Sequence, residues 1–430
     1  MFRKLTAIIM AMAMVFSVMA MLTSCSGENE DGIKIGVILI GDETEGYSKA
    51  HIDGIKAAAN ELGVSENNIV WKYKTLESSD CLDAATDLVG QGCTLIISNS
   101  YGHQTFMVQA AEQFPEITFA AMTGDFAALT GLDNFVNGFM GTYESRYVSG
   151  VVAGMKLKEL LDNGTLTAET QPKSFDENGN VKIGYVGAFD YSEVVSGYTA
   201  FYLGVKSIVE NVIMNVNYTE SWFDIDKEAA AAEALIADGA VIICQHADST
   251  GAPSATEKLL NNGTICYSVG YNIDMIDTAP NAALTSATNN WSVYYKKLIS
   301  SVMNGEDMPA DYSVGYANDG VKITPLGKSC AAGTAEKVAE VEAGIKNGTI
   351  KVFDTDTFTV SADQFTCTVT TDEAGHVTSC LVDTSFMDWS TMTPIYQGEL
   401  VECIVDGAFA ESTHRSAPYF SIRIDGIIEN

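Results

Sequence analysis

The chain has 430 residues, of which 47% are apolar, enough to bury two sizeable cores, so we expect two or three domains. Its formal net charge of −32 argues against nucleic-acid binding and favours a soluble life outside the cytoplasm. The nine cysteines show no C-x-x-C or other metal-ligand spacing, so the sequence predicts no metal site, and nothing in it indicates a cofactor.

The first 25 residues predict an export signal. Two cations near the start are followed by an almost wholly apolar run from Leu5 to Leu22. The tetrapeptide LTSC, which ends at Cys25, resembles the bacterial lipoprotein signal, in which the cysteine becomes lipidated and N-terminal. We therefore expect Cys25 to anchor the chain to the cell membrane, with residues 26–32 as a polar tether and the rest outside the cytoplasm. The alternative is an uncleaved apolar anchor followed by a buried cysteine.

From residue 33 the chain alternates strand and helix. The first run, Ile33–Ile40, is continuously apolar, which is typical of a parallel strand covered on both faces. The predicted strands of this half are 33–40, 69–74, 93–98, 117–122 and a short one near Phe135, and its predicted helices are 47–62, 82–89, 105–114 and 145–161.

Residues 162–180 break this pattern and indicate a surface excursion, after which the alternation restarts. The predicted strands of the second half are 182–186, 213–218, 240–245 and 265–269, and its predicted helices are 193–209, 228–237 and 254–260, with further helices at 291–303 and 337–346. Two βαβ halves predict an α/β fold of two doubly wound lobes joined by a hinge. Lobe 1 is expected at 33–150 with about 277–307, and lobe 2 at 151–276 with about 308–348.

The composition changes after residue 348. Residues 349–430 alternate polar and apolar side chains in the strand period, with many threonines and valines, and predict a small β-rich appendage. Cys367 and Cys380 flank the turn-forming stretch DEAG, so a hairpin there would bring them opposite one another. A disulfide and two free thiols both remain open, because cross-strand geometry must also suit the bond.

Candidate ligand residues follow from the topology. In open α/β sheets, ligands bind beyond the carboxyl ends of the strands, where loops lead into helices. The residues at these positions that we expect to bind ligand are Tyr47, Ser48, His51, Asn99, Ser100, Tyr101, Phe189, Trp222, Asp248 and Asp274. Aromatic rings with a few polar groups suit a flat heterocyclic or sugar-bearing ligand, although some of these rings could instead only cap the sheets.

Several stretches carry a resemblance to a known family. GYSKAHIDGIKAA, SNSYG, FPEITFAAMTG, NFVNGFMGTYESRYVSGVVAGM, KIGYVGAF, CQHADSTGAP and SVGYNIDM occur in order between about residues 33 and 348. Together they resemble the basic membrane lipoprotein family of ABC-transporter substrate-binding proteins. The resemblance implies a type I periplasmic-binding fold that binds a purine nucleoside or nucleobase and hands it to an ABC permease.

The resemblance also implies roles for individual residues. Tyr47 stands where family members carry a Phe or Trp that stacks on the base, and His51 matches a histidine of the same loop. Asn99 and Tyr101 match the second ligand loop, while Asp248 and Asp274 match polar positions that face the cleft. The chain departs from the family at Tyr47 itself, at Thr199, where relatives have Asn, and in its C-terminal appendage.

The main hypothesis is a membrane-anchored receptor for a small solute, and not an enzyme. The sequence has neither a G-x-S-x-G elbow nor an H-E-x-x-H helix. One alternative is a sensory lipoprotein that signals ligand to a membrane partner. Others are the same receptor role for a sugar or flavin-like ligand and, third, an enzyme acting on nucleosides.

Overall fold

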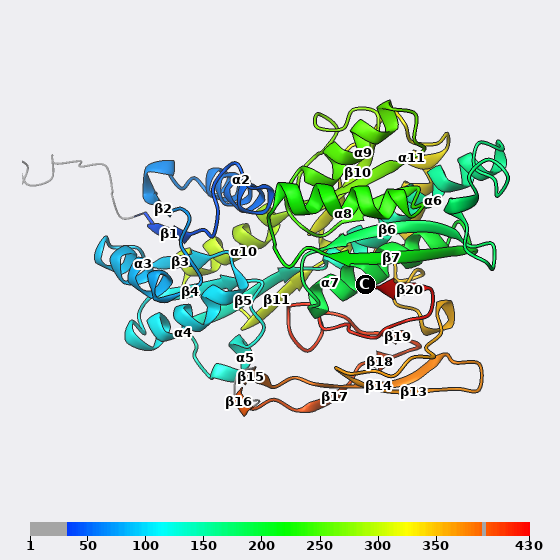
Figure 1. Cartoon of the computed structure of the whole chain (residues 1–430). Helices are drawn as coiled ribbons and strands as arrows, with labels where there is room; N and C mark the ends of the chain where they lie inside the picture. The colour runs from blue at the N-terminus through cyan, green and yellow to red at the C-terminus, as the bar shows by residue number, and fades with distance from the viewer. Residues whose placement is uncertain (1–31, 389–392) are drawn as a thin grey trace, which may run out of the picture.

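The computed structural model of the chain describes residues 32–388 and 393–430. These residues form two α/β lobes and a β-rich extension that runs along both of them, at the lower edge of Figure 1. The two-lobed α/β fold predicted from the strand–helix alternation is confirmed. The predicted lipidation site, Cys25, lies outside the described residues, as does nearly all of the tether.

The first lobe is built on a six-stranded sheet of order β11-β5-β4-β3-β1-β2, in which every neighbouring pair is parallel. Its elements are β1 Ile35–Ile38, α2 Gly46–Glu61, β2 Ile69–Lys72, α3 Ser79–Gly90, β3 Leu95–Ser98, α4 Gln104–Gln113, β4 Thr118–Met122, α5 Ala127–Thr130, β5 Phe135–Met140, α10 Trp291–Asn304 and β11 Asp311–Val314. The central strands β1 and β3 are buried at every residue, as a sheet covered on both faces requires.

The second lobe is built on a seven-stranded sheet of order β12-β10-β9-β8-β6-β7-β20, parallel except for the pair β10–β12. Its elements are α6 Thr142–Asp162, β6 Val181–Gly187, α7 Ser192–Lys206, β7 Val212–Tyr218, α8 Ile225–Ala237, β8 Ile242–Gln245, α9 Gly251–Asn261, β9 Tyr267–Tyr271, β10 Ala283–Asn289, β12 Val321–Ile323, α11 Thr334–Lys346 and β20 Ile427–Glu429. Helices α6 and α7 approach so closely at Gly150 that a Cβ there would stand 2.1 Å from the carbonyl oxygen of Phe201. The absence of a side chain at Gly150 therefore permits this packing.

The expected division of the chain between the lobes differs from the sheet membership. β10 extends the second sheet, although residues 277–307 were expected in lobe 1, and only α10 of that segment packs against α2 of the first lobe. β11 extends the first sheet, although residues 308–348 were expected in lobe 2. The physical reason is that these strands are rich in small or polar residues, so long-range pairing, which local pattern does not encode, decides which sheet they join.

The C-terminal extension comprises residues 349–430. Its strands are β13 Thr368–Thr371, β14 Val377–Asp383, β15 Phe386–Asp388, β16 Thr393–Tyr396, β17 Leu400–Glu402, β18 Ile404–Val405, β19 Ala408–Phe409 and the terminal β20, so it is β-rich as predicted. β13 and β14 pair as an antiparallel hairpin around the turn that begins at Asp372, also as predicted. Cys367 and Cys380 on either side of that turn are free thiols.

Candidate functional site: a cleft between the lobes

A cavity of about 650 Å³ lies between the carboxyl ends of the two sheets, a size in the usual range for small-molecule sites. The loops that line it follow β1, β2, β3 and β4 of the first lobe and β6, β7, β8 and β9 of the second. Seven of the ten predicted ligand residues line it: Tyr47, Asn99, Ser100, Tyr101, Phe189, Trp222 and Asp248. The cavity therefore occupies the place that the topology rule assigns to a ligand.

Three predicted ligand residues do not line the cavity. Ser48 is buried, and its Oγ accepts from the backbone of Gly41 and from the side chain of Asn99. His51 is buried one helical turn further on, where its Nδ1 hydrogen-bonds with the hydroxyl of Tyr295. Asp274 is exposed, and its carboxylate caps the backbone N–H of Ile276. Ser48 and His51 support the start of α2, which carries Tyr47, while Asp274 caps a turn outside the cavity.

Tyr47 projects from the first turn of α2 and is held from three sides. Both oxygens of Glu45 cap the helix by accepting from the backbone N–H groups of Tyr47 and Ser48 at 2.8 and 2.9 Å. The Tyr47 hydroxyl donates to the backbone carbonyl of Asn99, and the His51 ring meets it edge-on at 4.5 Å between centroids. The ring is thus fixed before any ligand arrives.

The loop after β3 is tied to the loop after β1. The Asn99 side chain is fully buried; its Oδ1 accepts from Ile40 N at 2.9 Å and its Nδ2 donates to Ser48 Oγ at 3.1 Å. Both of its polar atoms are engaged inside the protein, so Asn99 shapes the wall more than it offers groups to a ligand. Ser100 donates to Glu77 at 2.6 Å, and Tyr101 donates to Asp125 at 3.1 Å.

The second lobe contributes an aromatic cluster. Phe189 follows β6 and Trp222 follows β7, and their rings meet edge-on at 5.3 Å. Tyr191 stacks on Phe189 at 5.2 Å with an interplanar angle of 16°. Phe189 and Trp222 line the cavity, while Tyr191 is half exposed beside them. These rings offer flat apolar faces on the wall opposite Tyr47, which suits a planar ligand.

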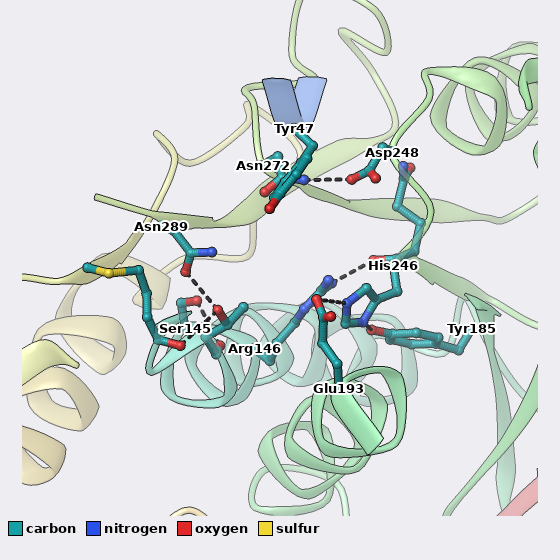
Figure 2. Close-up of polar contacts among 12 residues, drawn as sticks. Tyr47, Ser145, Arg146, Tyr185, Glu193, His246, Asp248, Asn272 and Asn289 are labelled. Carbon is teal, nitrogen blue, oxygen red and sulfur yellow. Dashed lines mark hydrogen bonds and ion pairs between the residues drawn. The ribbon is translucent and has the colours of Figure 1, made fainter. Parts of the chain in front are cut away.

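Asp248 is the most deeply buried carboxyl of the cavity wall, at 7% exposure. Its Oδ1 accepts from the side chain of Asn272 at 2.6 Å (Figure 2). Burial raises its pKa well above the usual value, and the nearby carboxyls of Glu45, Glu228 and Glu193 raise it further. A carboxyl in this state can donate or accept a hydrogen bond, and a ligand hydroxyl or ring nitrogen would satisfy it.

Near Asp248, Figure 2 shows four side chains that contact one another, namely Glu193, His246, Tyr185 and Arg146. Glu193 lines the cavity and lies 3.3 Å from Nε2 of His246, and burial raises its pKa to about 7 while Arg146 opposes the shift. The Arg146 guanidinium is fully buried, donates to the carbonyl of Gln245 at 2.6 Å and lies 3.8 Å from the ring centroid of Tyr271. The guanidinium therefore packs against the ring of Tyr271, and Tyr271 lines the cavity.

Glu45, Glu193 and Tyr271 line the cavity but lie outside the predicted set. Both glutamates sit at helix starts, where helix capping is the ordinary explanation of an acidic residue, so the sequence pattern gave no reason to choose them. Tyr271 ends β9, and the strand-end rule does select it, although the predicted ligand set did not include it.

Backbone strain also gathers at the cleft. Lys74, Thr123 and Glu220 line the cavity with φ angles of 54°, 62° and 53°, a left-handed conformation that residues other than glycine seldom adopt. Asn272, which holds Asp248, has a φ of 61°. Strained backbone of this kind persists where the surroundings hold it and is concentrated at ligand sites.

The cavity wall is strongly acidic. Its described ionisable side chains comprise one lysine, Lys74, and the carboxyls of Asp42, Glu45, Glu77, Glu193, Glu220 and Asp248. Lys74 is paired with Asp42 at 2.7 Å. Within residues 32–388 and 393–430, no group of three or more His, Cys, Asp or Glu side chains is arranged to hold a metal ion. The cleft therefore suits an uncharged or cationic organic molecule.

Two doubly wound lobes with a ring-lined, polar cleft between them define a solute-binding protein. Residues 39–356 match the family described as ABC transporter substrate-binding protein PnrA-like, and this chain belongs to that family. The resemblance found in the sequence is thereby confirmed, and the chain is a substrate-binding protein of an ABC transporter, not an enzyme.

Individual relatives agree with this assignment. A purine-binding protein of Brucella abortus is 30% identical over 75% of this chain and 84% of its own. A putative ABC transporter glucose-binding protein of Haloferax volcanii is 27% identical over 79% and 78%. An ABC-transporter solute-binding protein of Aeropyrum pernix has the same fold, with a TM-score of 0.60 at 17% identity, covering 77% of this chain and 94% of that one.

Family membership implies a small-molecule ligand, an ABC permease as partner and a place outside the cytoplasm. In the part of the chain that the structure describes, no helix is both long enough and apolar enough to cross a membrane.

Proposed function

We propose that this protein captures a purine nucleoside or nucleobase between its lobes, delivers it to an ABC permease, and is held at the membrane by a lipid on Cys25. One observation carries the ligand proposal: Tyr47 of the first lobe and Asp248 of the second line the same cavity, together with the rings of Phe189 and Trp222. A base between the rings gains about 1–3 kcal/mol per stack, and the buried carboxyl receives a hydroxyl or ring nitrogen. The purine-binding relative supports the same choice.

The cleft closes by a hinge motion around the bound molecule in this proposal. A buried carboxyl needs hydrogen-bond partners, so Asp248 favours the state in which a ligand supplies them. The acidic wall disfavours phosphorylated molecules, because an added phosphate would meet several carboxyls and a lysine already paired with Asp42. Nucleosides and bases are therefore preferred to nucleotides.

A sugar is the second candidate ligand, since a relative is a putative glucose-binding protein and aromatic rings also stack on sugars. Native mass spectrometry of the freshly purified full chain would identify any retained molecule. Titration calorimetry would then compare inosine, adenosine, guanosine and hypoxanthine with inosine monophosphate, glucose and riboflavin. We expect the nucleosides or bases to bind at least tenfold more tightly than the other three. Tightest binding of glucose or riboflavin would contradict the purine proposal.

The lipid anchor has a separate test. The protein expressed with its own signal in a bacterium that lipidates such sequences should fractionate with membranes and incorporate a fatty-acid probe. Cys25→Ser should be released or retained as an unprocessed precursor, without the probe. Equal labelling of the two proteins would remove Cys25 from the proposal.

A further inference from the structure

The C-terminal extension lies almost wholly beyond residues 39–356, the part of the chain that matches the family. It is fixed to the second lobe, because its last strand, β20, pairs in parallel with β7 at the edge of the second sheet. Arg423 strengthens this attachment through an ion pair with Asp190, which follows β6 of the second lobe. The buried carboxyl of Glu411 accepts from Ser196 of α7 at 2.8 Å.

The same extension is also attached to the first lobe (Figure 1). In the β15–β16 hairpin, Phe386 and Tyr396 pack on Phe126, with ring centroids 4.4 and 5.0 Å away. Ser416 donates from its backbone N–H and its hydroxyl to the same oxygen of Asp311, at 3.0 and 2.8 Å. Asp311 belongs to β11 of the first sheet. The extension therefore contacts both lobes. These contacts are separate from the segments of the chain that pass from one lobe to the other.

A third contact leads from the extension to the cleft. Nη1 of Arg415 lies 3.6 Å from Oδ2 of Asp125, and the same oxygen accepts from the hydroxyl of Tyr101 at 3.1 Å. The other oxygen of Asp125 accepts from the side chain of Gln104 at 3.2 Å. Tyr101 lines the ligand cavity. Arg415, Asp125 and Tyr101 thus form a continuous chain of contacts from the extension to the cavity wall.

The two charged side chains in this series of contacts are largely buried, which strengthens their attraction. The side chains of Arg415 and Asp125 are only 16% and 12% exposed, so water screens their attraction less than at an open surface. Tyr101 is 36% exposed, and its hydroxyl is bonded to Asp125. Removing the cation at Arg415 would leave the Asp125 carboxylate without its nearby positive charge and held by Gln104 alone on the side away from Tyr101.

We propose that the C-terminal extension is a strap between the lobes, and that Arg415 is a positioning residue which, through Asp125, sets the orientation of Tyr101 in the cleft wall. Hinge opening must then move the contacts at Phe126, Asp311 and Asp125 together. The effect on ligand affinity rests on the proposed function, whereas the effect on the Tyr101 ring does not.

Fluorine NMR of the full chain with 3-fluorotyrosine placed at position 101 tests the proposal without ligand. The variants are Arg415→Gln, Arg415→Lys and Asp125→Asn, and the control is Lys182→Gln, which removes an ion pair with Asp238 confined to the second lobe. We expect Arg415→Gln and Asp125→Asn to shift or broaden the fluorine signal, Arg415→Lys to do so less, and Lys182→Gln to leave it unchanged. Arg415→Gln should add nothing in an Asp125→Asn background.

Titration with inosine is the second measurement. We expect Arg415→Gln to bind inosine threefold to tenfold more weakly than the wild type, and Lys182→Gln to bind it as tightly as the wild type. An unchanged fluorine signal in Arg415→Gln and Asp125→Asn would overturn the proposal. If Arg415→Gln fails to fold, Arg415→Lys and Asp125→Asn decide it by the same signal. A wild-type chain that binds no purine would contradict the proposed ligand, and the fluorine comparison would still decide the role of Arg415.

Discussion

The two walls of the cleft use their polar groups differently. On the first-lobe wall, the side chains are bonded mainly to backbone or side-chain groups of the wall itself: Glu45 caps α2, Asn99 joins two loops, and Ser100 donates to Glu77. On the second-lobe wall, the carboxyls of Asp248 and Glu193 are buried with raised pKa values and few partners. This difference leads us to propose that the first wall places the ring of Tyr47 and that the second wall recognises the polar groups of the ligand.

Replacing Asp248 by Ala should give the largest loss of ligand affinity. The change leaves a polar group of the ligand unpaired in a buried place, which costs about 1–3 kcal/mol, so we expect an affinity about 5- to 150-fold weaker by titration calorimetry. Asp274→Ala is the matched control, because Asp274 is a predicted ligand residue that lies outside the cavity. Equal losses in the two variants, or none in Asp248→Ala, would remove the second wall from polar recognition.

Tyr47→Ala should weaken affinity by at least tenfold, since it removes one stacking ring, worth about 1–3 kcal/mol. Tyr47→Phe keeps the ring and loses only the hydroxyl that donates to the Asn99 carbonyl. We expect this control to lose less than the Ala variant does. An unchanged affinity in Tyr47→Ala would show that the first wall holds its ring for another purpose.

Asn99→Ala sharpens the comparison by disturbing the first wall without removing a ring. It leaves the partly buried backbone N–H of Ile40 without its acceptor, so we expect a cost near the lower end of the roughly 1–3 kcal/mol of a fully buried donor. We expect thermal unfolding several degrees lower and an affinity only a few-fold weaker, because the loop carrying Tyr47 is loosened. A large affinity loss at unchanged stability would instead make the Asn99 side chain a direct ligand contact.

Much of the fold and of the cleft could be predicted because both depend on local pattern. Buried parallel strands are continuously apolar, as in Ile35–Ile38, and the strand-end rule then selects residues such as Asn99 and Asp248 without knowledge of the folded chain. Tyr47 and Phe189 were found by the same rule on opposite walls of one cavity.

Other features depend on long-range packing and could not be predicted. The side chains of Ser48 and His51 lie on the helix next to Tyr47, yet they face Asn99 and Tyr295, which are distant in sequence. The strand Ala283–Asn289 carries no strong apolar pattern, and its sheet is set by pairing with β9. The strap function of the extension depends on contacts such as Arg415 with Asp125, which no spacing in the sequence encodes.

Glu193→Gln should have the smallest effect, and one that depends on pH. Burial raises the pKa of Glu193 from 4.5 to about 7, so the folded protein keeps this proton over a pH range where the unfolded chain has lost it. The neutral carboxyl therefore favours folding below about pH 4.5, and that advantage is lost as pH rises to about 7. Burial also lowers the pKa of the neighbouring His246 well below its usual value, which disfavours its charged form.

Gln cannot ionise but keeps a donor for Nε2 of His246, so the variant should match the wild type near pH 5 and exceed its stability at pH 8. Because the Glu193 side chain is still 22% exposed, we expect a gain of about 1–2 kcal/mol, measured by denaturant unfolding at the two pH values. Glu233→Gln, on an exposed helix surface, should show no such pH dependence. A constant difference between Glu193→Gln and wild type would mean that Glu193 is already ionised near pH 5, and that the second wall carries fixed negative charge rather than an exchangeable proton.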